Sequence, residues 1–132
     1  MPGSSRYMDT LTLETFLRRQ PHTPPANLFV ALMISDPTDA DTGTEVTYGG
    51  YARQIFAAGS VSSVGNRATC SNAGAIIFPQ STSPGGSVTH FAIRDALTGG
   101  NMLFYGPLQV TLQVNVGVEP RFDPGAITIT AE

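Results

Sequence analysis

The densest cluster of side chains able to do chemistry in this 132-residue sequence is the acidic stretch at residues 36–45. Within it Asp39, Asp41, Gly43 and Glu45 stand at alternate positions, a spacing that faintly resembles a calcium-binding loop. An EF-hand loop also needs a third oxygen ligand, a glycine at its sixth position, a glutamate at its twelfth and flanking helices, whereas these flanks have strand patterns. We therefore interpret the stretch as a solvated turn whose Asp side chains bond their own backbone.

A second candidate is the pair His90 and Asp95, which with a hydroxyl residue could suggest a hydrolase triad. The sequence has no nucleophile elbow, and two residues five apart on one strand project to opposite faces. His22 and Cys70 lack the neighbours that make a zinc site or a reactive thiol. We predict no catalytic residue, no metal and no cofactor, and hence a protein that is not an enzyme.

Two arginines, Arg53 and Arg94, stand among apolar residues in expected strands of a chain with few charges. One interpretation is a surface ion pair, such as Arg94 with Asp95 or Glu45. The other is a fork that holds a carboxylate or backbone group of a neighbouring subunit, and both arginines are candidate partner-binding residues. A glycan-binding face is poorly supported, because the chain has no tryptophan and only four tyrosines.

Residues 1–25 differ in composition from the rest and contain the one expected helix, with Asp9 as its N-cap and Pro21 as its stop. A helix this short is only marginally stable by itself in water, so we expect it to pack on its own domain or on a partner. We predict that residues 1–25 form a docking arm and residues 26–132 the folded domain. The candidate partner-binding residues of the arm form one apolar face and a basic end: Leu13, Phe16, Leu17, Arg18 and Arg19.

Strand patterns begin after the arm. The continuous apolar run at residues 28–34 predicts a strand buried on both faces or the first strand of a sandwich. From Leu108 to Val116 apolar and polar residues alternate without a break, which predicts a half-buried strand. Further strands are expected at residues 45–57, 68–78, 88–95, 102–105 and 127–130, with a Gly-Gly hairpin turn at 97–101. About eight short strands joined by Gly and Pro turns predict an all-β fold, an antiparallel β-sandwich or jelly roll.

The charge content excludes some classes of partner. Charged residues make up 13% of the chain, and seven arginines and no lysine stand against ten acidic residues, for a net charge of -3. No basic cluster is present to neutralise phosphates, so we expect no nucleic-acid partner. No apolar run approaches the roughly 20 residues of a membrane span, so we expect no membrane association. The single cysteine and the lack of a signal sequence predict synthesis in a reducing cytoplasm.

Several segments, in their order and spacing, carry a family likeness: DPTDA at 36–40, TGTEV at 42–46, GGYARQ at 49–54, VTHFAIRDALTGGN at 88–101 and LFYG at 103–106. From about Leu28 to its end the chain resembles a family of small virion proteins of tailed bacteriophages. Members are variously described as tail fibre, decoration or structural proteins. The resemblance implies synthesis in the cytoplasm of a bacterial host and a place in a phage particle, without saying where in the particle.

Two functions follow as hypotheses. The first, which we favour from the sequence, is a capsid cement or decoration protein on the outer surface of the shell, clamping major capsid protein subunits. The alternative is a tail, fibre or baseplate adaptor involved in host attachment. The uncharged strand at 108–116 would leave an unprotected sheet edge, so we also expect a homo-oligomer, a dimer or trimer. Addition of a capsid subunit's strand is the competing way to cover that edge.

Overall fold

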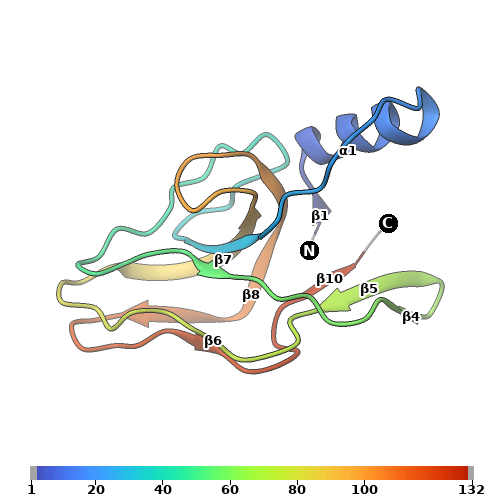
Figure 1. Ribbon diagram of the computed structural model, residues 1–132. Coiled ribbons are helices and arrows are strands. Elements are labelled where there is room, and N and C mark those ends of the chain that lie inside the picture. Colours follow the sequence, from blue (N-terminus) through green and yellow to red (C-terminus); the bar gives the residue numbers. More distant parts are fainter. Residues whose placement is uncertain (1–2, 131–132) are drawn as a thin grey trace.

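The structure, a computed structural model, describes residues 3–130 and is built from antiparallel sheets (Figure 1). The largest has the strand order β1-β8-β7-β2-β3, and the smaller ones are β10-β5-β4 and β6-β9. The strands are β1 (Gly3–Ser4), β2 (Phe29–Met33), β3 (Gln54–Ile55), β4 (Ser62–Val64), β5 (Arg67–Ser71), β6 (Ile76–Ile77), β7 (Gly86–Arg94), β8 (Met102–Val114), β9 (Arg121–Phe122) and β10 (Thr128–Thr130). The predicted all-β antiparallel class is confirmed.

The main core lies between the five-stranded sheet and the smaller sheets. Strand β2 sends Val30 and Leu32 into it, and β10 and the residue before it contribute Ile129 and Ile127. The opposite face of β2 buries Ala31 and Met33 against a second apolar cluster. The continuous apolar run therefore forms a strand buried on both faces, as predicted.

Strand β8 is one long strand where the sequence predicted two. The ladder with β7 pairs His90 with Pro107 and Val88 with Leu112, so residues 108–111 of β8 bulge opposite Thr89 alone. Proline has no N–H to donate, which explains why the ladder breaks there. The predicted burial of every apolar residue in 108–116 is therefore wrong. Val110 lies within the bulge and is 80% exposed, and Val116 lies beyond the end of β8 and is 63% exposed.

Two further predicted strands are interrupted. The expected strand 68–78 is divided into β5 and β6, because the buried side chain of Asn72 bonds the backbone of Gly74, Asp123 and Ile127 instead of continuing the ladder. The expected strand pair at 45–57 contributes only β3 and an isolated bridge between Glu45 and Met33. In the first segment the Asn72 side chain thus takes the place of ladder pairing. In the second, the hydroxyl of Tyr51 accepts from the amide of Leu32 on β2.

The helix begins earlier than predicted. Its N-cap is Ser5, whose hydroxyl accepts from the Met8 amide at 3.1 Å, so the assignment of Asp9 as N-cap is wrong. Helix α1 (Arg6–Thr12) continues into a wider π-helical turn, η1 (Leu13–Leu17). The chain then leaves the helix through Arg19, which has a φ of 58°.

Hydrogen bonds fix the helix to the body at its first turn. Strand β1 pairs with β8, and the buried Ser5 hydroxyl donates to the carbonyl of Met102. The backbone amide of Arg6 bonds the carbonyl of Asp39 at 2.9 Å. From this base the helix projects outward to its far end (Figure 1).

Ser5→Ala tests this anchor. Losing both the cap and the buried bond to Met102 should lower the free energy of unfolding by about 1 kcal/mol or more, measured by denaturant titration. Proteolysis within the helix should also become faster. Thr12→Ala is the control, because the Thr12 hydroxyl only bonds the Met8 carbonyl on an exposed surface. Equal stability of the two variants would contradict the anchor.

Candidate interaction site

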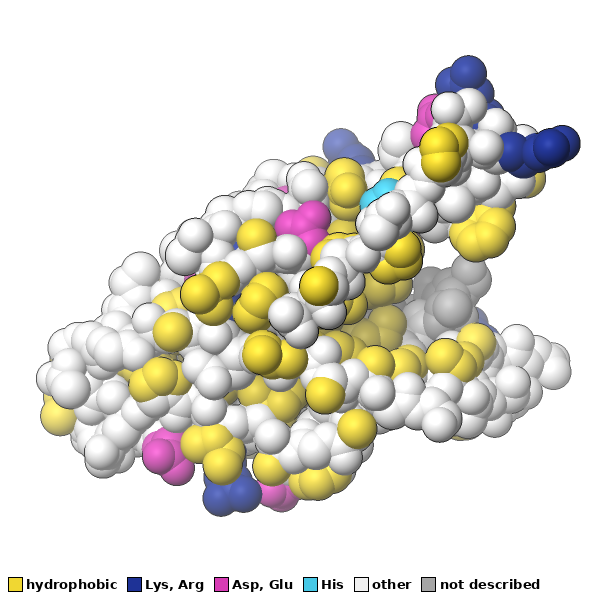
Figure 2. Space-filling model, in the orientation of Figure 1, with side chains coloured by type: hydrophobic (Ala, Val, Ile, Leu, Met, Phe, Trp, Pro, Cys, Tyr) yellow, Lys and Arg dark blue, Asp and Glu magenta, His cyan; other side chains and the backbone are white. Residues whose placement is uncertain are grey.

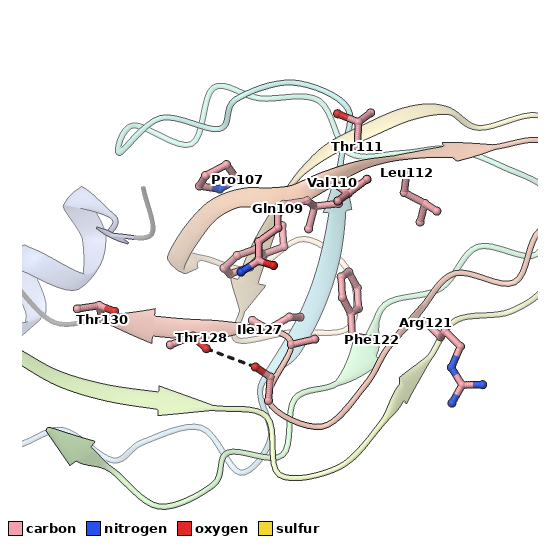
Figure 3. Close-up of a pocket in the computed structure, with 14 residues that line it drawn as sticks. Pro107, Gln109, Val110, Thr111, Leu112, Arg121, Phe122, Ile127, Thr128 and Thr130 are labelled. Carbon is pink, nitrogen blue, oxygen red and sulfur yellow. Dashed lines mark hydrogen bonds between the residues drawn. The ribbon is translucent and has the colours of Figure 1, made fainter. Parts of the chain in front are cut away.

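A groove of about 650 Å³ runs between β8 and the segment from β9 to β10. Leu108, Val110 and Leu112 line one side, and Phe122 and Ile127 line the other. In Figure 3 Gln109 reaches from β8 across the groove toward Ile127, and Arg121 points away from it. The walls therefore combine apolar side chains with threonines, Gln109 and one charged residue, Arg121.

Two sheet edges flank this groove. Strand β1 covers the outer edge of β8 only at Phe104 and Tyr105, so residues 106–112 have no strand neighbour on that side among residues 3–130. Strand β10 pairs with β5 on one side and is the last strand of its sheet on the other. Such edges favour contact with another polypeptide.

The far end of the helix carries the second exposed apolar surface. Leu13, Phe16 and Leu17 are 56%, 75% and 74% exposed, and because this turn is π-helical their place on one helix face stays a prediction. Arg18 pairs with Glu14 at 3.3 Å; the Arg18 side chain is largely exposed and that of Glu14 is partly buried. Figure 2 shows basic side chains at this end of the helix, beside hydrophobic ones. We refer to Leu13–Leu17 with Arg18 and Arg19 as the helix tip.

The inner side of the helix is closer to the body. Tyr7, Met8 and Leu11 face the proline stretch at residues 24–25 and Phe104 of β8 across a second hollow of about 620 Å³. Thr15 and Phe16 line the same hollow, so the helix faces its own domain beyond its base as well. Whether the tip residues bind a partner stays a prediction.

Both candidate arginines are engaged within their own chain. Arg53 is 8% exposed; its Nε and Nη2 donate to the carboxylate of Glu45 at 2.9 and 2.8 Å, and its Nη1 donates to the carbonyls of Ala96 and Gly99. Arg94 is 7% exposed and forks the carboxylate of Asp41, with both distances 2.6 Å. Their role in holding a neighbouring subunit stays a prediction.

Each of the three carboxylates at alternate positions of the acidic loop forms an ion pair with a different arginine. Asp39 pairs with Arg6 at 3.3 Å, Asp41 pairs with Arg94, and Glu45 pairs with Arg53. The carboxylates point to three different arginines, and within residues 3–130 no three His, Cys, Asp or Glu side chains gather as metal ligands. The loop is therefore a clamp between the helix base, β7 and the segment before β3.

Glu45 is the most strongly bonded of these carboxylates. Burial alone would raise its pKa, but the hydrogen bonds from Arg53 and Tyr51 outweigh burial and hold the pKa below its ordinary value. The Tyr51 hydroxyl donates to Glu45 at 2.5 Å and accepts from the Leu32 amide, and burial and this carboxylate raise the pKa of Tyr51 far above its usual range. The cluster is locked in one protonation state at neutral pH.

His90 does not face Asp95. Its Nδ1 lies 2.8 Å from the hydroxyl of Thr89, and its Nε2 lies 4.0 Å from Asp36, beyond hydrogen-bond length. Neither His90 nor Thr89 lines the two hollows described above. These contacts fit a partly buried strand residue.

A family model described as podophage GP4 fiber I protein gp80 matches residues 3–130. The chain belongs to this family. It is accordingly a structural protein of a phage virion, as the resemblance of the segments between residues 36 and 106 implied. The match also covers the helix, which precedes the part of the chain that carries that resemblance. No curated protein matches the chain. No helix of the described residues is long and apolar enough to cross a membrane.

The Glu45 cluster yields a pH-dependent prediction. Glu45→Gln removes the charge that Arg53 needs and should lower the free energy of unfolding by about 2 kcal/mol at pH 7. Because folding lowers the pKa of Glu45, its stabilisation is complete above the ordinary value of 4.5 and is lost as pH falls through the lowered value. The difference between wild type and variant should therefore shrink in acid.

Urea titrations from pH 7 down to pH 3 measure this difference. Glu119→Gln is the control, since Glu119 is exposed and its loss should change stability by less than about 0.5 kcal/mol. A difference for Glu45→Gln that grows on acidification would contradict the assigned pairing.

Proposed function

We propose that this chain is a fibre subunit of a podophage particle, a non-catalytic protein that works by binding other polypeptides. The observation that carries the proposal is the family match, which spans residues 3–130 and whose description names a fibre protein. The match includes the helix tip and both walls of the groove. The surfaces available for assembly thus belong to the part that the family shares.

The chemistry of the chain supports a binding role. Its most buried ionic groups, Arg53 and Arg94, are held by carboxylates of the same chain and serve to fix loops. Large apolar side chains remain exposed on the tip and at Val110. Exposed apolar patches on a small protein favour contact with other proteins.

Capsid cement is the second candidate. The chain has none of the internal repeats or heptads that would build a fibre shaft, and a small compact domain present in many copies could staple a shell. The two functions differ in position on the particle and in copy number, so one experiment separates them.

Purified virions should be labelled with gold-tagged antibodies to this chain and viewed by electron microscopy. Quantitative mass spectrometry of the same particles would count the chain against the major capsid protein. We expect label at the tail end and far fewer copies than the major capsid protein. Label over the whole shell, with copy numbers comparable to the major capsid protein, would overturn the fibre proposal in favour of cement.

A further inference from the structure

We propose that the groove between β8 and β10 receives an extended strand of another virion protein, which pairs with the free edge of β8. The inference rests on the proposed function, since the partner is a different polypeptide of the same particle, and it adds the form of that partner. Two properties of the groove support it. One wall is the edge of a strand, and the groove opens onto the main core.

The wall formed by β8 exposes backbone as well as side chains. A wall made by one face of a strand would contribute every second residue. Here every residue from 107 to 112 lines the groove, so the edge of the strand borders it. On the side opposite β7, residues 106–112 have no strand neighbour within the described part of the chain. The N–H and C=O groups of such an edge can pair with an added strand.

An added strand would continue a row that already exists on this edge. Strand β1 pairs with β8 at Phe104 and Tyr105 and goes no further along it in residues 3–130. Beyond that point β8 bulges, so that residues 108–111 stand opposite Thr89 alone. Val110, inside the bulge, is 80% exposed. The added strand would follow β1 along one edge of the same sheet and would cover Val110.

The groove also reaches the main core. Phe91 and Ile127 are only 3% and 1% exposed and belong to the main core cluster, yet both line the groove. Leu108, Leu112 and Phe122 pack against the same cluster and line the groove as well. In Figure 3 Phe122 and Ile127 lie across the opening from the residues of β8. Every second side chain of an added strand would face these core residues, and the others would face solvent.

The size and polarity of the groove define the partner segment. At the spacings found within and between sheets, 650 Å³ holds about four residues of a strand. The same volume holds little more than one turn of an α-helix, which is too short to be stable in water. Arg121, the charged residue among those that line the groove, points away from it (Figure 3). We therefore expect an uncharged segment with apolar residues at alternate positions.

The exposed segments of this chain are poor donors of such a strand. The longest run of exposed residues that the structure describes is 16–27, which contains Pro21, Pro24 and Pro25. Proline has no N–H to donate, and this spacing of prolines excludes a regular strand. Strand β4 (Ser62–Val64) is exposed, but it is already paired with β5 and offers one apolar side chain. A different virion protein is therefore the better source.

Hydrogen exchange tests whether the backbone of β8 is paired in the particle. Mass spectrometry would compare the purified full-length chain with intact virions. Amides of residues 108–112 should exchange about tenfold more slowly, or slower still, in virions, because strand pairing bonds them. Amides of Ser62–Val64, outside the groove, serve as the reference. Virion-bound chain whose β8 amides exchange as fast as in the purified protein would overturn this inference and leave the fibre proposal intact.

Photo-cross-linking in virions identifies the occupant. A benzophenone amino acid in place of Val110 should link to a segment of a different virion protein that has apolar residues at alternate positions. The same amino acid in place of Val64, which is 68% exposed on β4, is the matched control and should not link to that segment. Links from Val110 to copies of this chain alone, or to the same segment from both positions, would overturn the proposal.

A synthetic peptide of the linked segment then tests strand pairing with the purified full-length chain. Val110→Asp should weaken its binding about tenfold, because a charge would be buried under the strand, and Val64→Asp should leave binding unchanged. Both positions are largely exposed, so both variants should melt at the wild-type temperature. The same peptide with proline at its centre should fail to bind. Equal binding of the proline peptide would contradict pairing with β8.

Discussion

The path of β8 determines where the two exposed apolar surfaces of this protein lie. Its first residues pair with β1 and accept the Ser5 hydrogen bond at Met102, which sets the base of the helix. Its later residues form one wall of the groove. Pro107 lies between these halves and forces the bulge that turns Val110 outward. One strand thus determines where the helix starts, and how much of the apolar wall stays open.

Electrostatics reinforces this arrangement with very few charges. Of seven arginines, three are used by the acidic loop, where Asp39, Asp41 and Glu45 each hold one. The exposed pair with Asp39 contributes little, whereas breaking either of the other two would leave a buried guanidinium without its carboxylate. These three ion pairs hold the acidic loop to the helix base and to the body, and Arg121 is the charged residue among those that line the groove. That division suits a structural subunit more than a catalyst.

The sequence predicted those features that depend on local pattern. The run ending at Met33 forms a doubly buried strand because every residue in it is apolar, and the Gly99–Gly100 turn forms because both residues adopt positive φ. The partner of Arg94 could not be predicted, since Asp41 is 53 residues away and reaches it only through the folded loop. Ser5 was missed as the N-cap because its second hydrogen bond joins it to Met102, which is 97 residues away in the sequence. The alternation of apolar and polar residues indicated that Val110 would be buried. It did not indicate that the strand would bulge after Pro107 and leave Val110 exposed.

The account rests on the claim that this protein works by binding other polypeptides of the particle, with the open groove between β8 and β10 as one of its exposed surfaces. Cryo-electron microscopy of the assembled particle measures this directly, by showing what occupies the space between β8 and β10. The account predicts that another polypeptide lies against Val110 in the assembled particle. A groove open to solvent in every copy would contradict it.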